Sequence, residues 1–240
     1  LWLGETGENS NPWYYETRQL AEQHEIGWNW WTHKKLETTR APLSSSSNED
    51  YEKVVNYWKG NGPQPTTEEA RRGLFQMAED LAIEKNTLRP DLIASLFSNQ
   101  FGTTNKPYTN IEIPGQIFAV DYDIGNQGVS YSDTEYKQVS SDENQNTGNN
   151  GWSYRNDGVD IESCSDPTID YNIGWIETGE WLEYTVNITK SGSYTTKAII
   201  APTAASLKTQ LQAAISQIIA SKLSFTAPAI TATLNEDGSL

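Results

Sequence analysis

Two glutamates near the start of the chain carry groups that could do chemistry. Glu5 lies in a Gly-Glu-Thr-Gly run that follows the apolar residues 1–3, and Glu8 lies three residues further on. A carboxylate fixed at the end of a buried strand can attack an electrophilic carbon or take up a proton. A carboxylate in a solvated loop does neither, and the spacing of these residues alone leaves both interpretations open.

The elements around Glu5 predict where its side chain lies. We expect residues 1–3 to form a short buried strand, followed by a helix that Asn11 caps and Pro12 begins. The apolar face predicted for this helix consists of Trp13, Thr17, Leu20, Ala21 and His24. A second strand is expected at 26–31, so the order strand, helix, strand predicts a parallel pair. The ends of both strands then lie at one edge, where a (β/α) barrel places its catalytic groups.

Three further helices are predicted before residue 101. Asn48 can cap the first, Thr66 and Glu69 form a capping box for the second, and Pro90 begins the third. The apolar face predicted for the second of these helices consists of Ala70, Leu74, Met77, Ala78 and Leu81. The first hundred residues therefore read as two strands and several helices.

The composition changes after this α-rich region. Residues 102–112 form a polar linker, and residues 113–201 are rich in Gly, Asn, Tyr and Thr with short alternating runs. Such runs predict an all-β sandwich. Its strands are expected at 117–122, 158–161, 175–176, 181–188 and 194–200, with a polar loop at 142–151. Residues 202–240 form an atypical tail, because apolar residues repeat at the spacing of an amphipathic helix over 203–222.

The charge of the chain narrows the class of partner. The formal net charge is -15, from 17 Lys and Arg against 32 Asp and Glu. This balance excludes binding to nucleic acid or to an anionic membrane surface, both of which need basic patches. An uncharged polymer is compatible with it, and nine Trp and twelve Tyr offer flat apolar faces for stacking. We expect the natural N-terminus, with any export signal, to lie upstream of Leu1.

The two strand ends near the N-terminus resemble a known enzyme family. Residues 3–11 (LGETGENSN) and 27–31 (GWNWW) are similar to the seventh and eighth strand ends of glycoside hydrolase family 5, the cellulase-type retaining hydrolases. The resemblance implies that Glu5 is the nucleophile. It also implies that Trp30 or Trp31 is the subsite tryptophan, with Trp30 fitting slightly better.

The mechanism that this resemblance implies is retaining hydrolysis by two carboxylates about 5 Å apart. One attacks the anomeric carbon, and the other protonates the leaving oxygen and then activates water. The acid/base of the family lies in an Asn-Glu-Pro context that this sequence lacks, since Asn48-Glu49 is followed by Asp50. We therefore expect residues 1–101, the C-terminal fragment of such a barrel, to be inactive alone.

A second resemblance covers about residues 111–201. Its motifs are Ile113-Pro114-Gly115, Asp121-Tyr122-Asp123, 128–134, Tyr154-Arg155, 158–162, 173–184 and Gly192-Ser193-Tyr194. In this order they resemble a family 6 carbohydrate-binding module, a β-jelly-roll whose cleft binds β-glucans, xylan or agar-type chains. The resemblance implies that Trp175 stacks on the sugar and that Glu162 and Glu183 hydrogen-bond its hydroxyls. By their own sequence context, Trp175 as a core residue and Glu162 as a rim acid stay open as alternatives.

The region departs from this family in two ways. The Glu or Gln residues that ligate a structural calcium in the family are replaced by Phe118 and Val120, so we expect no structural calcium and no other cofactor. The second stacking aromatic of the family comes from the last third of the module, but the resemblance ends after Ile200. A cleft with one aromatic wall should bind more weakly, by about 1 kcal/mol or more.

These patterns predict a mixed fold: a partial (β/α)8 TIM-barrel end with trailing helices, then an all-β jelly-roll sandwich. The predicted function is that of a fragment of a secreted or cell-surface retaining β-glycosidase, endo-β-1,4-glucanase-like, with an appended carbohydrate-binding module. The expected partner is a polysaccharide, a β-glucan or a related plant or algal glycan, without metal, nucleic acid or membrane. A non-catalytic polysaccharide-binding protein and an incomplete gene product are the alternatives.

Overall fold

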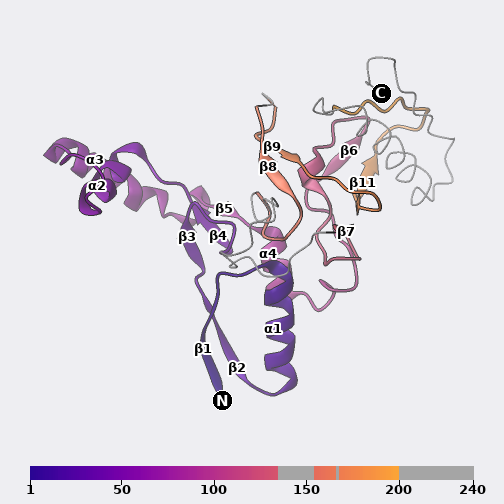
Figure 1. Cartoon of the computed structure of the whole chain (residues 1–240), viewed down its shortest axis with the longest axis horizontal. Coiled ribbons are helices and arrows are strands. Elements are labelled where there is room, and N and C mark those ends of the chain that lie inside the picture. Colours follow the sequence, from indigo (N-terminus) through magenta and orange to yellow (C-terminus); the bar gives the residue numbers. More distant parts are fainter. Residues whose placement is uncertain (135–153, 166–167, 200–240) are drawn as a thin grey trace. The chain divides into compact units, whose positions relative to one another are not determined.

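The computed structural model describes residues 1–134, 154–165 and 168–199 (Figure 1). These residues divide into two compact units. Unit 1 comprises 1–99 and 154–157, and unit 2 comprises the other described residues. Within the described ranges there are four α-helices, four two-stranded sheets, one three-stranded sheet and no closed barrel. The predicted mixture of helices and strands is confirmed, and the relation of unit 1 to a barrel stays a prediction.

Unit 1 begins with a parallel strand-helix-strand arrangement. Strand β1 (Trp2–Gly7) pairs in parallel with β2 (Gly27–Trp31), and helix α1 (Asn11–Gln23) connects them. The predicted parallel pair is therefore confirmed. The predicted cap is wrong by one residue: the Ser10 hydroxyl accepts a hydrogen bond from the Trp13 N–H at 3.3 Å, and Asn11 is the first helical residue.

The buried face of α1 agrees with the predicted one at Ala21 and differs from it at other positions. Tyr14, Arg18 and Ala21 are buried, whereas Leu20 is 58% exposed. Arg18 lies in the interior because its guanidinium donates to Glu22 and to the side chain of Asn99, 81 residues away. The apolar periodicity of α1 could not reveal this, since a buried cation depends on its distant partners.

The core of unit 1 forms where α1 meets helix α4 (Pro90–Phe97). Tyr14, Leu92 and Leu96 are almost fully buried and pack together. Three tryptophans pack against this cluster: Trp13, Trp28 and Trp30. The Tyr14 hydroxyl accepts from the Asn9 N–H at 2.7 Å, and burial raises the pKa of this hydroxyl above its ordinary value.

A network of buried amides joins three segments of unit 1. The Asn11 Nδ2 donates to Asp91 at 2.8 Å, and the Asn156 Nδ2 donates to the side chain of Asn11 at 2.8 Å. The Asn156 Nδ2 also donates to the carbonyl of Asn9 at 2.8 Å. Residues 154–157 thereby fold with unit 1, although they lie 55 or more residues beyond α4 in the chain.

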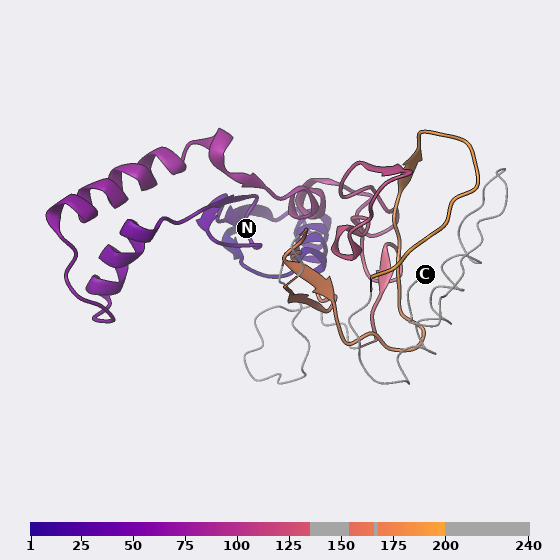
Figure 2. The same ribbon diagram turned by 90° about the horizontal axis from the view of Figure 1, so that it is seen from above.

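The other part of unit 1 is a small sheet and a helical hairpin. Strands β3 (Lys34–Leu36), β4 (Leu43–Ser45) and β5 (Thr87–Leu88) form the three-stranded sheet, which the sequence did not predict. Helices α2 (Glu49–Trp58) and α3 (Thr67–Asp80) lie side by side (Figures 1 and 2), and a 3-10 turn, η1 (Ile83–Lys85), follows them. The starts of α2, α3 and α4 agree with the predicted helix starts.

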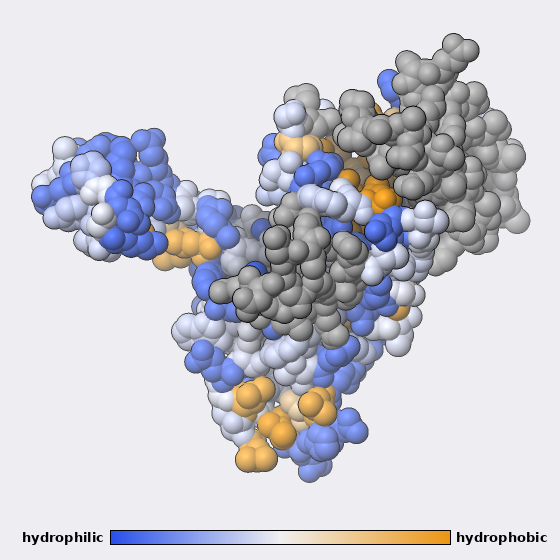
Figure 3. All heavy atoms as spheres, viewed as in Figure 1, coloured by the Kyte–Doolittle hydropathy of each residue, from blue (hydrophilic) through white to orange (hydrophobic). Residues whose placement is uncertain are grey.

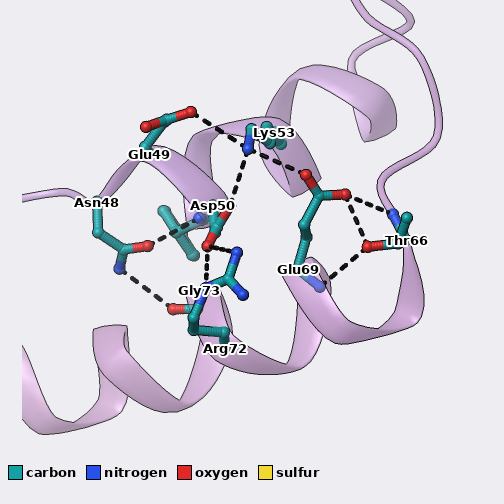
Figure 4. Close-up of polar contacts among 9 residues, drawn as sticks. Asn48, Glu49, Asp50, Lys53, Thr66, Glu69, Arg72 and Gly73 are labelled. Carbon is teal, nitrogen blue, oxygen red and sulfur yellow. Dashed lines mark hydrogen bonds and ion pairs between the residues drawn. The ribbon is translucent and has the colours of Figure 1, made fainter.

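Polar side chains hold the α2–α3 hairpin together (Figure 4). Asn48 caps α2 and also donates to the carbonyl of Gly73 in α3 at 3.2 Å. A Cβ at Gly73 would come within 2.4 Å of the backbone of α2, so only glycine permits this close approach. The predicted capping box is confirmed, since Thr66 and Glu69 exchange hydrogen bonds. Lys53 reaches from α2 to Glu69 at 3.1 Å.

Unit 2 consists of short strands joined by irregular segments. They are β6 (Ile111–Ile113), β7 (Tyr131–Ser132), β8 (Ile161–Ser163), β9 (Tyr171–Ile173), β10 (Trp181–Leu182) and β11 (Val186–Ile188). Strands β6 and β11 are parallel, whereas β7 pairs with β10 and β8 with β9 in antiparallel fashion. The region is β-rich, as predicted, and a complete jelly roll stays a prediction.

Several predicted strands of unit 2 are wrong in position. A 3-10 turn, η2 (Ala119–Asp121), replaces the strand expected at 117–122, because the Asp121 N–H turns back to the carbonyl of Phe118. Residues 175–176 and 194–199 form no strand, and the run 181–188 is broken into β10 and β11. The loop at 142–151 and the helix at 203–222 lie outside the described residues.

The interior of unit 2 mixes apolar and acidic side chains. Tyr122 and Tyr131 are fully buried and meet edge to face, with ring centroids 5.4 Å apart. Asp123 is also fully buried, and it accepts hydrogen bonds from Asn105 at 2.8 Å and from the Thr185 hydroxyl at 2.6 Å. The short strands are thus tied together by side-chain bonds to a buried carboxylate as well as by apolar packing.

No helix in the described ranges combines the length and the apolar character needed to cross a membrane.

Candidate functional site

The antiparallel β8–β9 hairpin of unit 2 brings together residues that the sequence singles out. Glu162 on β8 lies directly opposite Asn172 on β9. Beyond the strand pair, the Cys164 N–H donates to the carbonyl of Asp170 at 2.8 Å. At the other end the Gly174 N–H donates to the carbonyl of Asp160 at 2.9 Å. The register of Glu162 is therefore fixed from both sides.

The carboxylate of Glu162 is half-buried and held by the opposite strand. Its Oε1 accepts from the Asn172 Nδ2 at 3.2 Å. The same oxygen lies 3.2 Å from the point that a Cβ on Gly174 would occupy. Glycine at position 174 therefore lets the carboxylate lie against the backbone immediately before Trp175.

Trp175 follows this glycine at a sharp turn. Its φ is +41°, a left-handed value that tryptophan rarely adopts, and 45% of its surface is exposed. Strained backbone of this kind is often found at binding sites, where the fold fixes a side chain in place. The structure therefore presents Trp175 to solvent rather than to the core.

The segment that follows Trp175 is fastened at a second point. The Glu177 N–H donates to the carboxylate of Glu180 at 2.8 Å. Both carboxylates also contact the Thr134 hydroxyl, with oxygen–oxygen distances of 2.8 Å from Glu177 and 2.9 Å from Glu180. The Thr134 hydroxyl thus ties this turn to the segment that follows β7, a contact that the sequence did not predict.

Glu183 lies apart from the hairpin, between β10 and β11. Its N–H donates to the carbonyl of Ser130 at 2.9 Å, and its carbonyl accepts from the Asp123 N–H at 2.7 Å. The nearby Tyr184 hydroxyl donates to the carbonyl of Ala119 at 2.8 Å. Glu183 is thus placed by backbone bonds to the buried centre of unit 2, and its assignment as a sugar contact stays a prediction.

In unit 1, the predicted nucleophile lies on a strand rather than after one. Glu5 is part of β1 and is exposed. The pairing of β1 with β2 is irregular between Leu3 and Thr6, so two residues, Gly4 and Glu5, lie opposite Asn29. The Asn29 side chain donates to the carbonyl of Gly4 at 3.1 Å, which fixes this irregular part of the pair.

The two predicted subsite tryptophans face in opposite directions, since neighbouring side chains of a strand alternate. Trp30 packs into the core, with its ring 4.0 Å from that of Tyr14 in an edge-to-face contact. Trp31, which pairs with Gly7, is 51% exposed. Of the two, Trp31 is the residue that a ligand could reach.

Trp2 is an exposed aromatic that the sequence reading left out. It pairs with Gly27, and a Cβ on Gly27 would meet the ring of Trp2 at 2.4 Å. The ring therefore lies over a glycine, and it stays 68% exposed. The exposure of Trp2 could have been predicted from the sequence, because the parallel register places this tryptophan opposite Gly27.

The beginning of β1 is exposed as well, so the buried strand predicted for residues 1–3 is wrong. Apolar side chains gather at the end of unit 1 where β1 begins (Figure 3). Leu1 is fully exposed, and Leu20 of α1 is more than half exposed. This end of the strand pair thus presents apolar surface, whereas its core side is covered by α1.

The residues at the family's calcium positions do not fit a metal. Val120 is fully buried, Phe118 is partly buried, and neither side chain carries an oxygen. Over the described ranges, no group of three or more His, Cys, Asp or Glu residues is arranged to hold a metal ion.

Comparison with known proteins gives one match. Residues 152–224 match the model of the carbohydrate binding module family 6. The match covers less than a third of the chain and includes Glu162, Trp175 and Glu183. The match does not extend to residues 1–151, which contain Glu5, Trp30 and Trp31, so it gives no support to a hydrolase domain. No curated protein and no solved structure matches the chain.

Proposed function

We propose that this chain binds an uncharged polysaccharide through the β8–β9 hairpin of unit 2. The observation that carries the proposal is the half-buried carboxylate of Glu162 beside an exposed Trp175, inside the stretch matched by a carbohydrate-binding family. An exposed indole ring provides a flat apolar face for one side of a pyranose ring. A fixed carboxylate beside it accepts hydrogen bonds from the hydroxyls at the sugar's edge.

The charge of the chain agrees with an uncharged ligand. The formal net charge of -15 repels anionic polymers over the distance that salt leaves unscreened. Neutral glycans feel no such repulsion. The finer assignments follow from the resemblance alone: the ligand is a β-glucan or a related plant or algal glycan, and the protein acts at the cell surface or after secretion.

Affinity electrophoresis tests the proposal directly. The chain is run in native gels that contain a soluble neutral polysaccharide, and retardation relative to a gel without polymer reports binding. We expect Trp175→Ala to abolish most of the retardation, because the stacking face is lost. Trp58→Ala is the matched control, since Trp58 is 70% exposed in unit 1. Equal mobility of the parent and Trp175→Ala in every gel would refute the site.

A second candidate function rests on unit 1. The parallel strand-helix-strand arrangement with an exposed Glu5, and Trp31 exposed on the neighbouring strand, favours descent from a retaining β-glycosidase. Such an enzyme needs two carboxylates about 5 Å apart, and one alone supplies little. We therefore expect no turnover of an aryl β-cellobioside by this chain. Turnover that Glu5→Gln abolishes would contradict this expectation and show that the Glu5 carboxylate takes part in the reaction.

A further inference from the structure

The orientation of the Asn172 side chain follows from its two neighbours. Its Nδ2 lies 3.2 Å from the Glu162 Oε1 and 3.1 Å from the carbonyl oxygen of Ile173. Both neighbours are acceptors, so the atom between them must be the NH2 group of the amide. Both amide protons are used there, and the Asn172 Oδ1 is left as an acceptor that points away from them.

Glu162 contributes a second acceptor on the same face of the hairpin. Ionised carboxylates have no proton to donate. Within the described ranges, the bond from Asn172 is the one that the Glu162 side chain accepts, and no cation pairs with it. Because Glu162 and Asn172 lie directly opposite each other and their side chains share a hydrogen bond, the Glu162 Oε2 and the Asn172 Oδ1 offer one acceptor each from the two strands of the hairpin.

A pair of acceptors without a cation discriminates between sugars. Two neighbouring hydroxyls of a pyranose can each donate one proton to it, and charge-assisted bonds of this kind are the strong ones. A carboxylate or sulfate in the same place brings no proton and adds repulsion between like charges. An anionic group also leaves the two acceptors without a hydrogen-bond donor, and this loss weakens binding further.

We infer that Glu162 and Asn172 together act as a charge filter, which admits uncharged pyranoses with two neighbouring hydroxyls and rejects glycans that carry an anionic group there. This inference rests on the proposed function of the same hairpin and names the class of sugar that it takes. Asn172 acts through Glu162 as a positioning residue, since it fixes the direction of the carboxylate. It also supplies the second acceptor.

The test compares two polymers that share one backbone. Hydroxyethylcellulose and carboxymethylcellulose are both substituted β-1,4-glucans, and only the second is charged. Binding of the full chain is measured by affinity electrophoresis and by titration calorimetry in 0.5 M NaCl, where the Debye length of a few ångströms suppresses the general repulsion by the acidic chain. We expect the parent chain to bind the neutral polymer at least tenfold more tightly.

Glu162→Gln removes the charge and keeps the shape of the side chain. We expect it to reduce the preference for the neutral polymer to less than about threefold, chiefly by improving the binding of carboxymethylcellulose. Glu112→Gln is the matched control, because Glu112 is an exposed acid of unit 2 on β6 and its substitution changes the net charge equally. Glu112→Gln should leave the preference of the parent unchanged.

Asn172→Ala and Asn172→Asp test the positioning role. Both variants should weaken binding of hydroxyethylcellulose by about tenfold. Asn172→Gln keeps an amide that can reach Glu162, so we expect it to restore part of the affinity. A role in folding alone would lower the thermal midpoint of Asn172→Ala without this rescue.

The outcomes separate the inference from the proposed function. Binding that depends on Trp175 but shows the same preference in the parent and in Glu162→Gln overturns the charge filter and leaves the binding site standing. A parent chain that binds neither polymer, nor any other neutral glycan, overturns both.

Discussion

Unit 1 and unit 2 bury different kinds of side chains. Unit 1 has an apolar cluster of Tyr14, Leu92 and Leu96. It also buries charged side chains of both signs, among them Arg18, Asp91 and Arg155. In unit 2 the buried set includes four aspartates alongside its apolar residues: Asp121, Asp123, Asp133 and Asp160. Among the described residues, the buried charged groups of unit 2 are all acids, whereas unit 1 buries arginines together with its acids, as in the pair of Arg155 and Asp91. The two- and three-residue strands of unit 2 satisfy little of their own backbone, so side chains must do so.

This difference predicts which substitutions destabilise each unit most. Loss of an apolar group leaves a cavity, and its cost depends on how far the neighbours relax. Loss of a buried carboxylate leaves several donors without a partner, and each donor that stays buried adds a desolvation penalty. We therefore expect single substitutions of polar core residues to cost more in unit 2 than single substitutions of apolar core residues cost in unit 1.

The largest effect is expected for Asp123→Ala in unit 2. Its carboxylate accepts three hydrogen bonds: from Asn105 and from the backbone and hydroxyl of Thr185. We expect the free energy of unfolding to fall by about 4 kcal/mol, the usual range for breaking a buried charged group from its partners. Urea unfolding with hydrogen exchange assigns the loss to unit 2. The exposed Asp170→Ala is the control and should change the stability by less than about 0.5 kcal/mol.

Leu92→Ala in unit 1 should come next. Leu92 is fully buried between α1 and α4, and truncation of such a leucine costs about 3 kcal/mol. Leu88→Ala deletes the same atoms from a side chain that is 58% exposed, so its effect should be several times smaller. Thermal unfolding followed by circular dichroism measures both. If Leu92→Ala cost more than Asp123→Ala, the contrast between the two units would be wrong.

Asn156→Ala tests the amide network that unit 1 does contain. The Asn156 side chain donates to Asn9 and Asn11, both at 2.8 Å. We expect a loss of about 2 kcal/mol, because two buried acceptors lose their donors. The loss should appear as faster hydrogen exchange in α1 and α4, not in unit 2. Asn61→Ala, at an exposed position beyond α2, is the matched control.

The smallest effect is expected from the surface network of the α2–α3 hairpin. Hydrogen bonds from the Thr66 backbone and hydroxyl, with Lys53 nearby, lower the pKa of Glu69 from 4.5 to about 2. A lowered pKa means that the carboxylate stabilises the hairpin above its unfolded pKa of 4.5, and that this contribution is lost as the pH falls toward 2. Circular dichroism between pH 5 and pH 2 should show the helix signal falling over this window.

Thr66→Ala removes the hydroxyl of this box and should move the acid loss of helix signal toward higher pH. Thr67→Ala, one residue further on and outside the box, should leave the acid profile where it was. Identical acid profiles for the parent and Thr66→Ala would show that the box contributes nothing to the hairpin in acid.

The features that the sequence predicted depend on neighbouring residues, and those that it missed depend on distant ones. The helix starts at Asn48, at the Thr66–Glu69 box and at Pro90 follow from residues within one turn, so each could be read locally. The buried Arg18 of α1 could not, because its partner Asn99 lies 81 residues away. A cation on a helix face usually indicates the solvated side.

The sequence predicted only part of the candidate site. Glu162 and Trp175 were found through an ordered run of motifs, but Asn172 and Thr134 were not. The role of Asn172 depends on the cross-strand register, and that of Thr134 on a contact with residues more than 40 positions away. The strand expected at 117–122 failed for a similar reason, since short strands are set by their partners more than by their own residues.

Residues 154–157 belong both to the stretch that the family model matches and to unit 1. They lie near the start of that stretch and supply Asn156 to the interior of unit 1. A division of the chain at residue 152 would separate residues 154–157 from the rest of unit 1. The Asn11 side chain would then lose its donor, Asn156. The interior of unit 1 therefore depends on residues that lie beyond the first part of unit 2 in the chain, so a shortened chain that ends before residue 154 should have a less stable unit 1.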